Sequence, residues 1–587
     1  MKKICLFLCI IIFGTRCSKE LDIEDVSNYQ PEQVWNDLQQ ANAFVANLYN
    51  KFGNWNVAAD RNSEQLSGIA FGENAITVTG ASTASWDYAN VRLANLAIRD
   101  VQAGKLSQSE KESILAQAYF MRAYTYFSMV KEYGGVPIVK TPLDRYTDEL
   151  DLPRNSTKEC FDFIVEDLDK AIPLLPAKID VTSTDWGHID GNFAQAFKAK
   201  VLLYKASPLF NPGNPWNNAY WAEAYTENKK AYEALKGQGY GLIEDYGKIA
   251  LSEKNSEIVF PVINKFPGKT ASWDFGARPG SLSRGNASAC PTWEFVKAFP
   301  MKDGKQYDDP TGTYYKTDAV FLQSYWKNRD PRFEKSILWN AKTFPVAGTP
   351  KGYKQYTSVG IASANDNFGI NPNVADKSTN NNTYTGFFIL KNCNLGLTQP
   401  NVQQYDIDFV LMRFAEVMLN YAEAANEAGH TADALVLLRE IRKRAGIEPG
   451  AGSTYGITAA SRADVRQAIM NERNIELCFE GHRFNDLRRW RLFSLLDQKT
   501  KSGVEAIAIN ANGTEMPILQ AQQQAGTFSL SEENFKYSVV QVPQTGVQKN
   551  IVPDKYYFYP IAQSIINKTT KLEQNKDWGG SFDPTLH

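Results

Sequence analysis

Three glutamates and a histidine in the C-terminal third of the chain are of the residue types that bind metal ions. Glu472, Glu476 and Glu480 recur at four-residue spacing, which places them on one face of a helix, and His482 follows closely. Helical carboxylate sites use a Glu-x-x-His step, whereas Glu480-Gly-His482 is one residue too short. Gly481 also interrupts the helical register. We therefore predict two helices that meet at Gly481 and are held by ion pairs, and no metal site.

The surrounding segment supplies the cations and the apolar side chains that such a junction needs. It reads NERNIELCFEGHRFNDLRRW over residues 471–490. Its cations are Arg473, Arg483, Arg488 and Arg489, and its apolar side is formed by Ile475, Leu477, Phe479, Phe484 and Leu487. This segment is therefore predicted to be scaffold that holds no ligand.

Motifs for nucleotide binding or nucleophilic catalysis are incomplete. FPGKT (residues 266–270) resembles the end of a phosphate-binding loop, but Ile263 stands where the first glycine must be. SLSRG (residues 281–285) lacks the leading glycine of a nucleophile elbow. A glycosidase needs two carboxylates that face each other across a cleft, and linear sequence does not exclude such a pair.

The N-terminus has the layout of a bacterial lipoprotein signal. Two lysines precede the apolar run Ile4–Phe13, which is too short to span a bilayer. Small residues and then Cys17 follow, although Arg16 takes a position where a small residue is usual. We predict cleavage after residue 16, a lipid such as palmitate on Cys17 and a charged tether over residues 17–30, with simple secretion as the alternative.

Composition limits the classes of partner. The 587 residues carry a formal net charge of −2, and this mild acidity argues against nucleic acid as a main partner. No later apolar stretch approaches the roughly twenty residues that a spanning helix needs. Beyond the signal and Cys17 the cysteines are widely spaced, so we expect buried thiols and no zinc site; they are Cys160, Cys290, Cys393 and Cys478.

Helical periodicity predicts four pairs of helices. Apolar residues recur at three- and four-residue spacing in each pair. The pairs are 31–52 with 86–102, 107–131 with 156–175, 192–206 with 217–235, and 408–428 with 431–445. Small residues at the crossing points are typical of a tetratricopeptide-like array.

Between residues 237 and 407 the helical period fades. Gly, Pro, Asn, Ser and aromatic residues dominate there, and the short apolar run 257–264 is predicted to be a strand. A second irregular stretch covers residues 501–553. Long irregular segments on a rigid scaffold are where binding residues usually lie.

The chain resembles the SusD/RagB family, outer-membrane lipoproteins with which Bacteroidetes capture nutrients for a TonB-dependent transporter. The resemblance rests on six ordered blocks that run nearly the whole chain. They are AQAYFMRAYTYFSMVKEYGGVPIV (116–139), PTWEFVKAFPMKDG (291–304), RDPRFEKSIL (329–338), residues 413–446, residues 471–490 and YYFYPIAQSIIN (556–567). Trp293, Ala562 and Ile565 depart from the residues usual at their positions.

The resemblance implies a mostly α fold, a tetratricopeptide-like hairpin array with a large loop-rich, minor-β segment packed on it. It also implies a non-catalytic binding protein without a cofactor, anchored by its lipid at the surface of the outer membrane. The implied partners are a glycan and a SusC-like TonB-dependent transporter barrel. A peptide-binding, RagB-like member of the same family is the alternative, and a hydrolase on the same scaffold is a third hypothesis.

Glycan binding points to tryptophans outside the helical pattern, because indole rings stack on the apolar faces of sugars. We predict a platform of Trp86, Trp273 and Trp326, with Trp293 as a fourth candidate. Loop tryptophans also anchor loops, and that alternative stays open for each of them. Arg284, Asn286 and Asp60 are candidates for hydrogen bonds to the ligand, and the alternative that each is an ordinary surface polar group stays open.

These expectations divide the chain into six parts. They are a signal peptide (1–16), a lipidated tether (17–30), N-terminal helical hairpins (31–236), a loop-rich ligand-binding segment (237–407), C-terminal helical hairpins (408–500), and an irregular segment with a C-terminal block (501–587).

Overall fold

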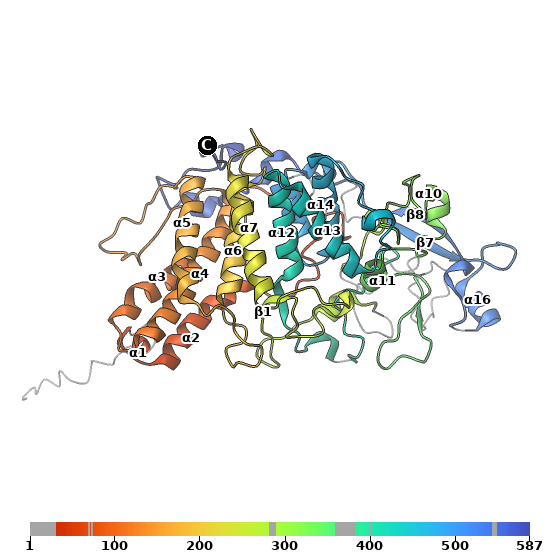
Figure 1. Ribbon diagram of the computed structural model, residues 1–587, viewed down its shortest axis with the longest axis horizontal. Helices are drawn as coiled ribbons and strands as arrows, with labels where there is room; N and C mark the ends of the chain where they lie inside the picture. Colours follow the sequence, from red (N-terminus) through yellow and green to blue (C-terminus); the bar gives the residue numbers. More distant parts are fainter. Residues whose placement is uncertain are drawn as a thin grey trace, which may run out of the picture.

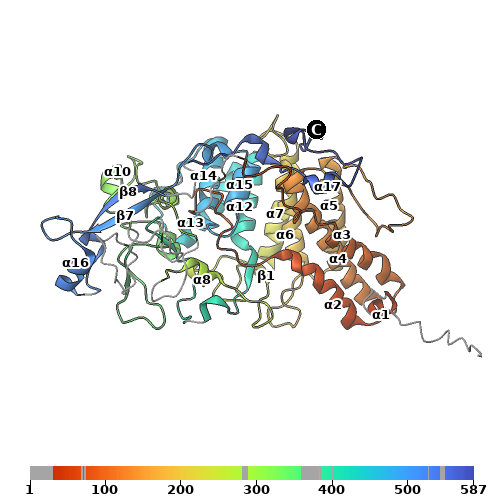
Figure 2. The ribbon, with the colours of Figure 1, turned by 180° about the vertical axis from the view of Figure 1, so that it is seen from behind.

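The computed structural model describes residues 31–67, 71, 74–280, 289–357, 383, 385–398, 401–526, 528–542 and 549–586. The fold is mostly helical, as predicted, with strands only in small two-stranded sheets within these ranges. Figures 1 and 2 show the long helices side by side at one end of the molecule and a loop-rich part at the other. No helix in these ranges has both the length and the apolar character needed to cross a membrane.

The helical array confirms the predicted pairing of helices. α4 packs on α5, α6 on α7, and α12 on α13, while α3 lies against both α2 and α4. The helices of the array are α1 (Pro31–Trp35), α2 (Leu38–Leu48), α3 (Tyr88–Asp100), α4 (Gln108–Tyr133), α5 (Thr157–Ala171), α6 (Gly191–Ala206), α7 (Tyr220–Gly237), α12 (Phe414–Glu427), α13 (Thr431–Ala445) and α14 (Arg462–Glu476).

Local sequence explains where these helices begin and end. Ser107 and Ser156 start α4 and α5 with capping boxes, in which the Glu110 and Glu159 carboxylates accept a hydrogen bond from the backbone nitrogen of the capping serine. Gly446 caps the C-terminal end of α13 with a φ of 82°, which few other residues adopt without strain. The array is therefore specified mainly by local signals together with one apolar face per helix.

The helix predicted over residues 408–428 begins later in the structure, at Phe414. Residues 408–413 were expected to be helical, but β6 (Phe409–Arg413) is a strand that pairs antiparallel with β1 (Ile258–Val262). The sequence Phe-Val-Leu-Met fits either structure, and the partner strand decides in favour of the sheet. β1 itself confirms the strand predicted over 257–264.

The loop-rich part contains the other sheets and most of the short helices. β2 (Ile337–Leu338) pairs with β5 (Phe388–Ile389), β3 (Lys342–Thr343) with β4 (Lys354–Gln355), and β7 (Ser502–Ala508) with β8 (Phe535–Gln541). The remaining helices are α8 (Trp273–Ala277), α9 (Trp293–Ala298), α10 (Asp318–Leu322), α11 (Pro331–Ser336), α15 (Arg483–Arg489), α16 (Ile518–Ala525) and α17 (Gln563–Ile566).

Each part has its own apolar core. The core of the array includes Phe120, Phe193 and Leu438, whereas that of the loop-rich part includes Trp293 and Phe333. The loops of residues 237–407 therefore build a packed core despite their lack of periodicity. The four cysteines in the described ranges are buried, as expected.

The two cores meet at a buried charge cluster around the C-terminal end of α14. Fully buried Glu476 accepts hydrogen bonds at 2.8 Å from Arg332 of α11 and from Arg413 of β6, and it also bonds to Arg444 of α13. Arg332 also binds Glu472 at 2.6 Å. Helices of the array, a strand and a short helix of the loop-rich part thus share one set of ion pairs.

The junction predicted at Gly481 is confirmed. α14 ends at Glu476, α15 begins at Arg483, and Gly481 between them has a φ of 79°. Glu480 accepts from Arg413 Nε at 2.8 Å and from Lys391 Nζ at 2.5 Å. The third glutamate therefore also belongs to the charge cluster.

We predict that Glu480→Gln destabilises the protein by about 3 kcal/mol near pH 6, because it leaves two buried cations short of a carboxylate. Burial would raise the pKa of the Glu480 carboxyl, but Arg413 and Lys391 outweigh burial and lower the pKa to about 2. The contribution of Glu480 to the free energy of unfolding is therefore complete above the ordinary pKa of 4.5 and is lost as the pH falls toward 2. Urea denaturation at pH 6 and pH 3 measures both effects.

The matched control is Glu515→Gln, whose carboxylate pairs with exposed Lys536 at 2.9 Å. We expect it to change the free energy of unfolding by less than about 0.5 kcal/mol. Equal effects of the two substitutions at pH 6, or a Glu480→Gln effect that grows as the pH falls, would contradict the role given to Glu480.

Candidate functional site

Trp273 and Trp293 are core residues, which corrects the prediction that they are exposed platform residues. Trp273, at the start of α8, is 2% exposed, and its Nε1 donates to the backbone oxygen of Lys391 at 2.9 Å. Trp293 starts α9, is 4% exposed and stacks parallel to Phe387 with ring centroids 6.2 Å apart. Neither indole offers a ring face to a ligand, because the loop-rich part uses both rings as core.

Trp86 and Trp326 are only partly buried, but they do not share a surface. Trp86 precedes α3 and packs against Tyr88 and Tyr133, with ring centroids 5.5 and 5.4 Å away. Trp326 follows α10 and packs against Tyr537 at 5.3 Å. Helices α3 and α10 lie at opposite ends of the molecule in Figures 1 and 2. The four tryptophans therefore do not form one platform.

Asp60 is a buried structural carboxylate, and its burial contradicts both the predicted hydrogen bond to a ligand and the alternative of an ordinary surface polar group. It is 1% exposed and accepts from the backbone nitrogens of Gly481 at 2.8 Å and Arg483 at 3.1 Å. Burial raises its pKa to about 6, and these backbone donors oppose the rise. Asp60 thus supports the junction at Gly481. The other predicted residues, Arg284, Asn286 and Cys17, lie outside the described residues.

His482 does not act with the glutamates as a ligand cluster. Its Nε2 lies 3.8 Å from Glu416, and burial lowers its pKa although Glu416 opposes this. Across the described part of the chain, no three His, Cys, Asp or Glu side chains are arranged to hold a metal ion. The glutamates at four-residue spacing, first considered as metal ligands, instead form ion pairs with arginine and lysine side chains.

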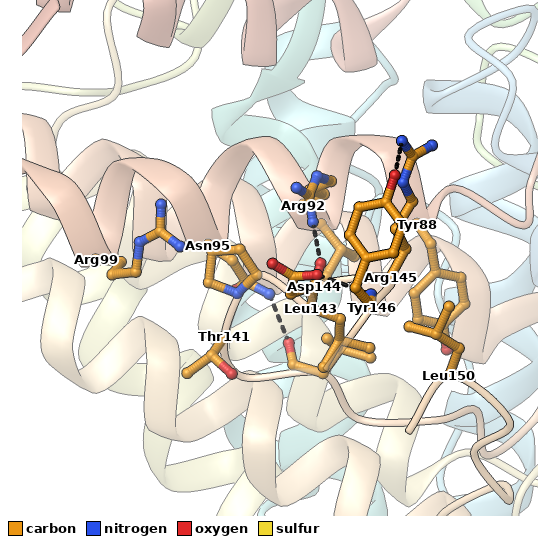
Figure 3. A pocket seen from close by; sticks show the side chains of 13 residues that line it. Tyr88, Arg92, Asn95, Arg99, Thr141, Leu143, Asp144, Arg145, Tyr146 and Leu150 are labelled. Carbon is orange, nitrogen blue, oxygen red and sulfur yellow. Dashed lines mark hydrogen bonds between the residues drawn. The ribbon is translucent and has the colours of Figure 1, made fainter. Parts of the chain in front are cut away.

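An open groove of 680 Å³ lies between α3 and the connection from α4 to α5, and we take it as the candidate site. Figure 3 shows it from close by. Aromatic, polar and aliphatic side chains line it together. The lining residues are Tyr88, Val91, Arg92, Asn95, Arg99, Val139, Thr141, Pro142, Leu143, Asp144, Arg145, Tyr146 and Leu150.

One wall of the groove is a single face of α3. Tyr88, Arg92, Asn95 and Arg99 follow one another at spacings of four, three and four residues, which aligns them along the helix. Asp87 caps the helix by accepting from the Asn90 backbone nitrogen. The spacing of these α3 residues can be recognised in the sequence, but the segment that faces them across the groove cannot.

The opposite wall, residues 139–150, is fixed to α3 by hydrogen bonds that Figure 3 draws as dashed lines. Arg92 Nη1 donates to the Leu143 oxygen at 2.6 Å, and Asn95 Nδ2 donates to the Val139 oxygen at 2.9 Å. Asn95 is in turn held by Arg122, which also forms a buried two-bond pair with Asp167 at 2.7 Å. The groove therefore has anchored walls.

The rim of the groove carries an exposed aromatic ring. Tyr146 is 79% exposed, and the Arg145 guanidinium lies 4.6 Å from the centroid of its ring. Asp144 shapes this turn by accepting from the Tyr146 backbone nitrogen at 2.8 Å. An exposed ring backed by a cation is a surface for stacking.

The groove is equipped for binding more than for covalent chemistry. Its lining contains one carboxylate, Asp144, whereas hydrolysis of a glycosidic bond uses two. It contains no serine, cysteine, histidine or lysine that would act as a nucleophile or base. Arginine, asparagine and threonine donors beside aromatic rings suit a polar ligand that has apolar faces.

Comparisons with known proteins assign the family. The model described as "SusD family" matches residues 256–578, more than half of the chain, and one described as "Starch-binding associating with outer membrane" matches residues 23–203. SusD-like protein P38 of Formosa agariphila is 22% identical over 507 residues, which cover 82% of this chain and 90% of that protein.

Solved structures share the fold. A SusD-like protein from Bacteroides fragilis superposes with a TM-score of 0.71 at 22% identity, covering 93% of this chain and 98% of that one. A SusD-like carbohydrate-binding protein from the same species gives a TM-score of 0.70 at 19% identity, covering 92% and 99%. Family model, relative and structures agree, and the chain therefore belongs to the SusD family.

Proposed function

We propose that this protein binds an oligosaccharide or polysaccharide in the groove between α3 and residues 139–150, without covalent chemistry. The observation that carries the proposal is the exposed Tyr146 ring at the rim of a groove rich in hydrogen-bond donors. Membership of the SusD family supports it, and one structural neighbour is named a carbohydrate-binding protein.

Sugar chemistry matches this arrangement. A pyranose ring has apolar faces, which stack on aromatic rings, and hydroxyl groups at its edge, which accept and donate hydrogen bonds. Tyr146 offers a face, while exposed Arg92 and Thr141 lie in the same lining. Because the groove is open, a chain could enter and leave along it, and the affinity of a single site is expected to be modest.

Trp86 and Trp326 remain proposed ligand residues in places of their own. Trp86 touches Tyr88, which lines the groove, so it would extend the same binding surface. Trp326, with the Lys327 ammonium 5.9 Å from its ring, would form a separate contact for a long polysaccharide.

We further propose that a lipid on Cys17 holds the protein at the outer surface of the outer membrane and that it delivers its glycan to a SusC-like TonB-dependent transporter. The sequence of residues 1–17 supports the anchor. The description of the family model that matches residues 23–203 supports a location at the outer membrane. Holding glycan beside a transporter raises its effective concentration there, which compensates for modest affinity.

Tyr146→Ala is expected to weaken binding of the glycan ligand about tenfold, because it removes an aromatic stacking contact worth about 1.5 kcal/mol. Calorimetry or affinity electrophoresis against a panel of glycans finds the ligand and measures the change. Tyr315→Ala is the control, since Tyr315 is also exposed, at 49%, but lies just before α10.

A bound glycan whose affinity is unchanged by Tyr146→Ala would place the site elsewhere. Binding of peptides with no binding of any glycan would favour the peptide-binding alternative and contradict the proposal. Release of shorter sugars from the glycan by the purified protein would instead indicate a hydrolase.

The proposed anchor has its own test in cells. Labelled palmitate is expected to enter the wild-type protein and to be absent from Cys17→Ala, because the thiol at that position is the acceptor. Cys160→Ala serves as the control, since that thiol is buried. Equal labelling of Cys17→Ala and the wild type would exclude lipid at Cys17.

A further inference from the structure

The connection that forms one wall of the groove is tied to the C-terminal segment (residues 568–586) as well as to α3. The Asp151 carboxylate accepts from the Thr570 backbone nitrogen at 2.8 Å, from the Thr570 hydroxyl at 2.5 Å and from the Lys571 backbone nitrogen at 3.2 Å. Beside it, the Glu149 carboxylate pairs with Lys571 Nζ at 3.0 Å. Figure 2 shows α17, which precedes this segment, at the same end of the molecule as α3 and α5.

A second tie between the connection and the C-terminal segment is formed by Arg154. Its Nη1 donates to Asn575 Oδ1 at 2.8 Å, and its guanidinium lies 3.5 Å from the centroid of the Phe582 ring. Its other nitrogens donate to the backbone oxygens of Tyr133 at 2.5 Å and Gly135 at 2.7 Å, at the end of α4. One side chain thus joins the end of α4, the connection and the C-terminal segment.

These ties leave only a short part of the connection between fixed points. Arg92 holds the connection at Leu143, and Asp151 holds it at the C-terminal segment. The residues between these points, 144–150, are all exposed and include Tyr146. A loop that is held at both ends has fewer conformations than one held at a single end. The position of the Tyr146 ring relative to α3 therefore depends on both ties.

We propose, resting on the proposed function of the groove, that Asp151 is a positioning residue for glycan binding. Through Thr570 and Lys571 it holds the Tyr146 ring at the groove, and it does not itself touch the ligand. Without this tie, a sugar that stacks on Tyr146 would have to order the connection as it binds, and that ordering lowers affinity. The C-terminal segment thereby supports binding although none of its residues lines the groove.

Asp151→Ala removes the acceptors for Thr570 and Lys571 and tests the proposal. We expect it to weaken binding of the glycan found in the panel about threefold, because the connection must then be ordered on binding. The loss should appear mainly as a less favourable binding entropy, which calorimetry measures together with the affinity. Asp151→Asn keeps one side-chain oxygen as an acceptor for Thr570, so its loss of affinity should be smaller.

Asp180→Ala is the matched control. The Asp180 carboxylate accepts from the Thr182 backbone nitrogen at 2.8 Å and from the Thr182 hydroxyl at 2.5 Å, the same distances as in the contacts of Asp151 with Thr570. Asp180 lies in a separate turn and does not line the groove, so Asp180→Ala should leave glycan affinity unchanged. Both variants should retain the thermal unfolding midpoint of the wild type, since the bonds they remove are on the surface.

Two further measurements separate positioning of the ring from general support of the fold. If Asp151 acts through the Tyr146 ring, Asp151→Ala should have little further effect on glycan affinity in a Tyr146→Ala background. In the protein without ligand, trypsin should cleave after Arg145 about threefold faster in Asp151→Ala than in the wild type, because the exposed part of the connection opens more often. Mass spectrometry of the fragments identifies the cleavage, and Asp180→Ala should not change its rate.

The role given to Asp151 is overturned if Asp151→Ala binds glycan as tightly as Asp180→Ala does. Full additivity of the effects of Asp151→Ala and Tyr146→Ala, or an unchanged rate of cleavage after Arg145, would overturn it as well. A wild type that binds no glycan would overturn the proposed function and this role together. A wild type that binds glycan through Tyr146, with equal affinity in Asp151→Ala, overturns the role of Asp151 alone.

Discussion

The buried charge cluster around Glu476 is the interaction on which the rest of the structure depends. Its arginines come from α11, β6 and α13, so a single carboxylate on α14 joins the helical array to the loop-rich part. Charges taken out of water are tolerated only when every partner is present. The cluster therefore forms only when α11, β6, α13 and α14 adopt this one arrangement. The apolar cores on either side exclude water from it.

Contacts within the array hold both walls of the groove in place. One wall of the groove is a face of α3, and the other is a connection that Arg92 and Asn95 fasten to that face. Behind them, the Arg122 and Asp167 pair ties the same region to α5. The walls are therefore ordered before a ligand arrives, so binding is spared the entropy loss of ordering them. Tyr146, in the exposed part of the connection, presents its ring to solvent.

The sequence predicts what is local and misses what is distant. Helix pairs follow from apolar period and capping serines, and the junction at Gly481 follows from the spacing of its glutamates. The sequence does not predict the burial of Trp273, because this burial depends on the Lys391 carbonyl, 118 residues away, and on a core formed by loops without periodicity. The groove is not predictable from sequence for the same reason. Residues 88–99 show a polar face, but they do not reveal that residues 139–150 lie opposite it.

Capture of glycan in the groove is the central claim, and a structure of the complex tests it most directly. Crystals of the protein soaked with the tightest-binding oligosaccharide of the panel should show a sugar ring against Tyr146, with hydroxyl groups within hydrogen-bond distance of residues on α3. Density for the sugar only at another place, with the groove between α3 and residues 139–150 left empty, would contradict the account.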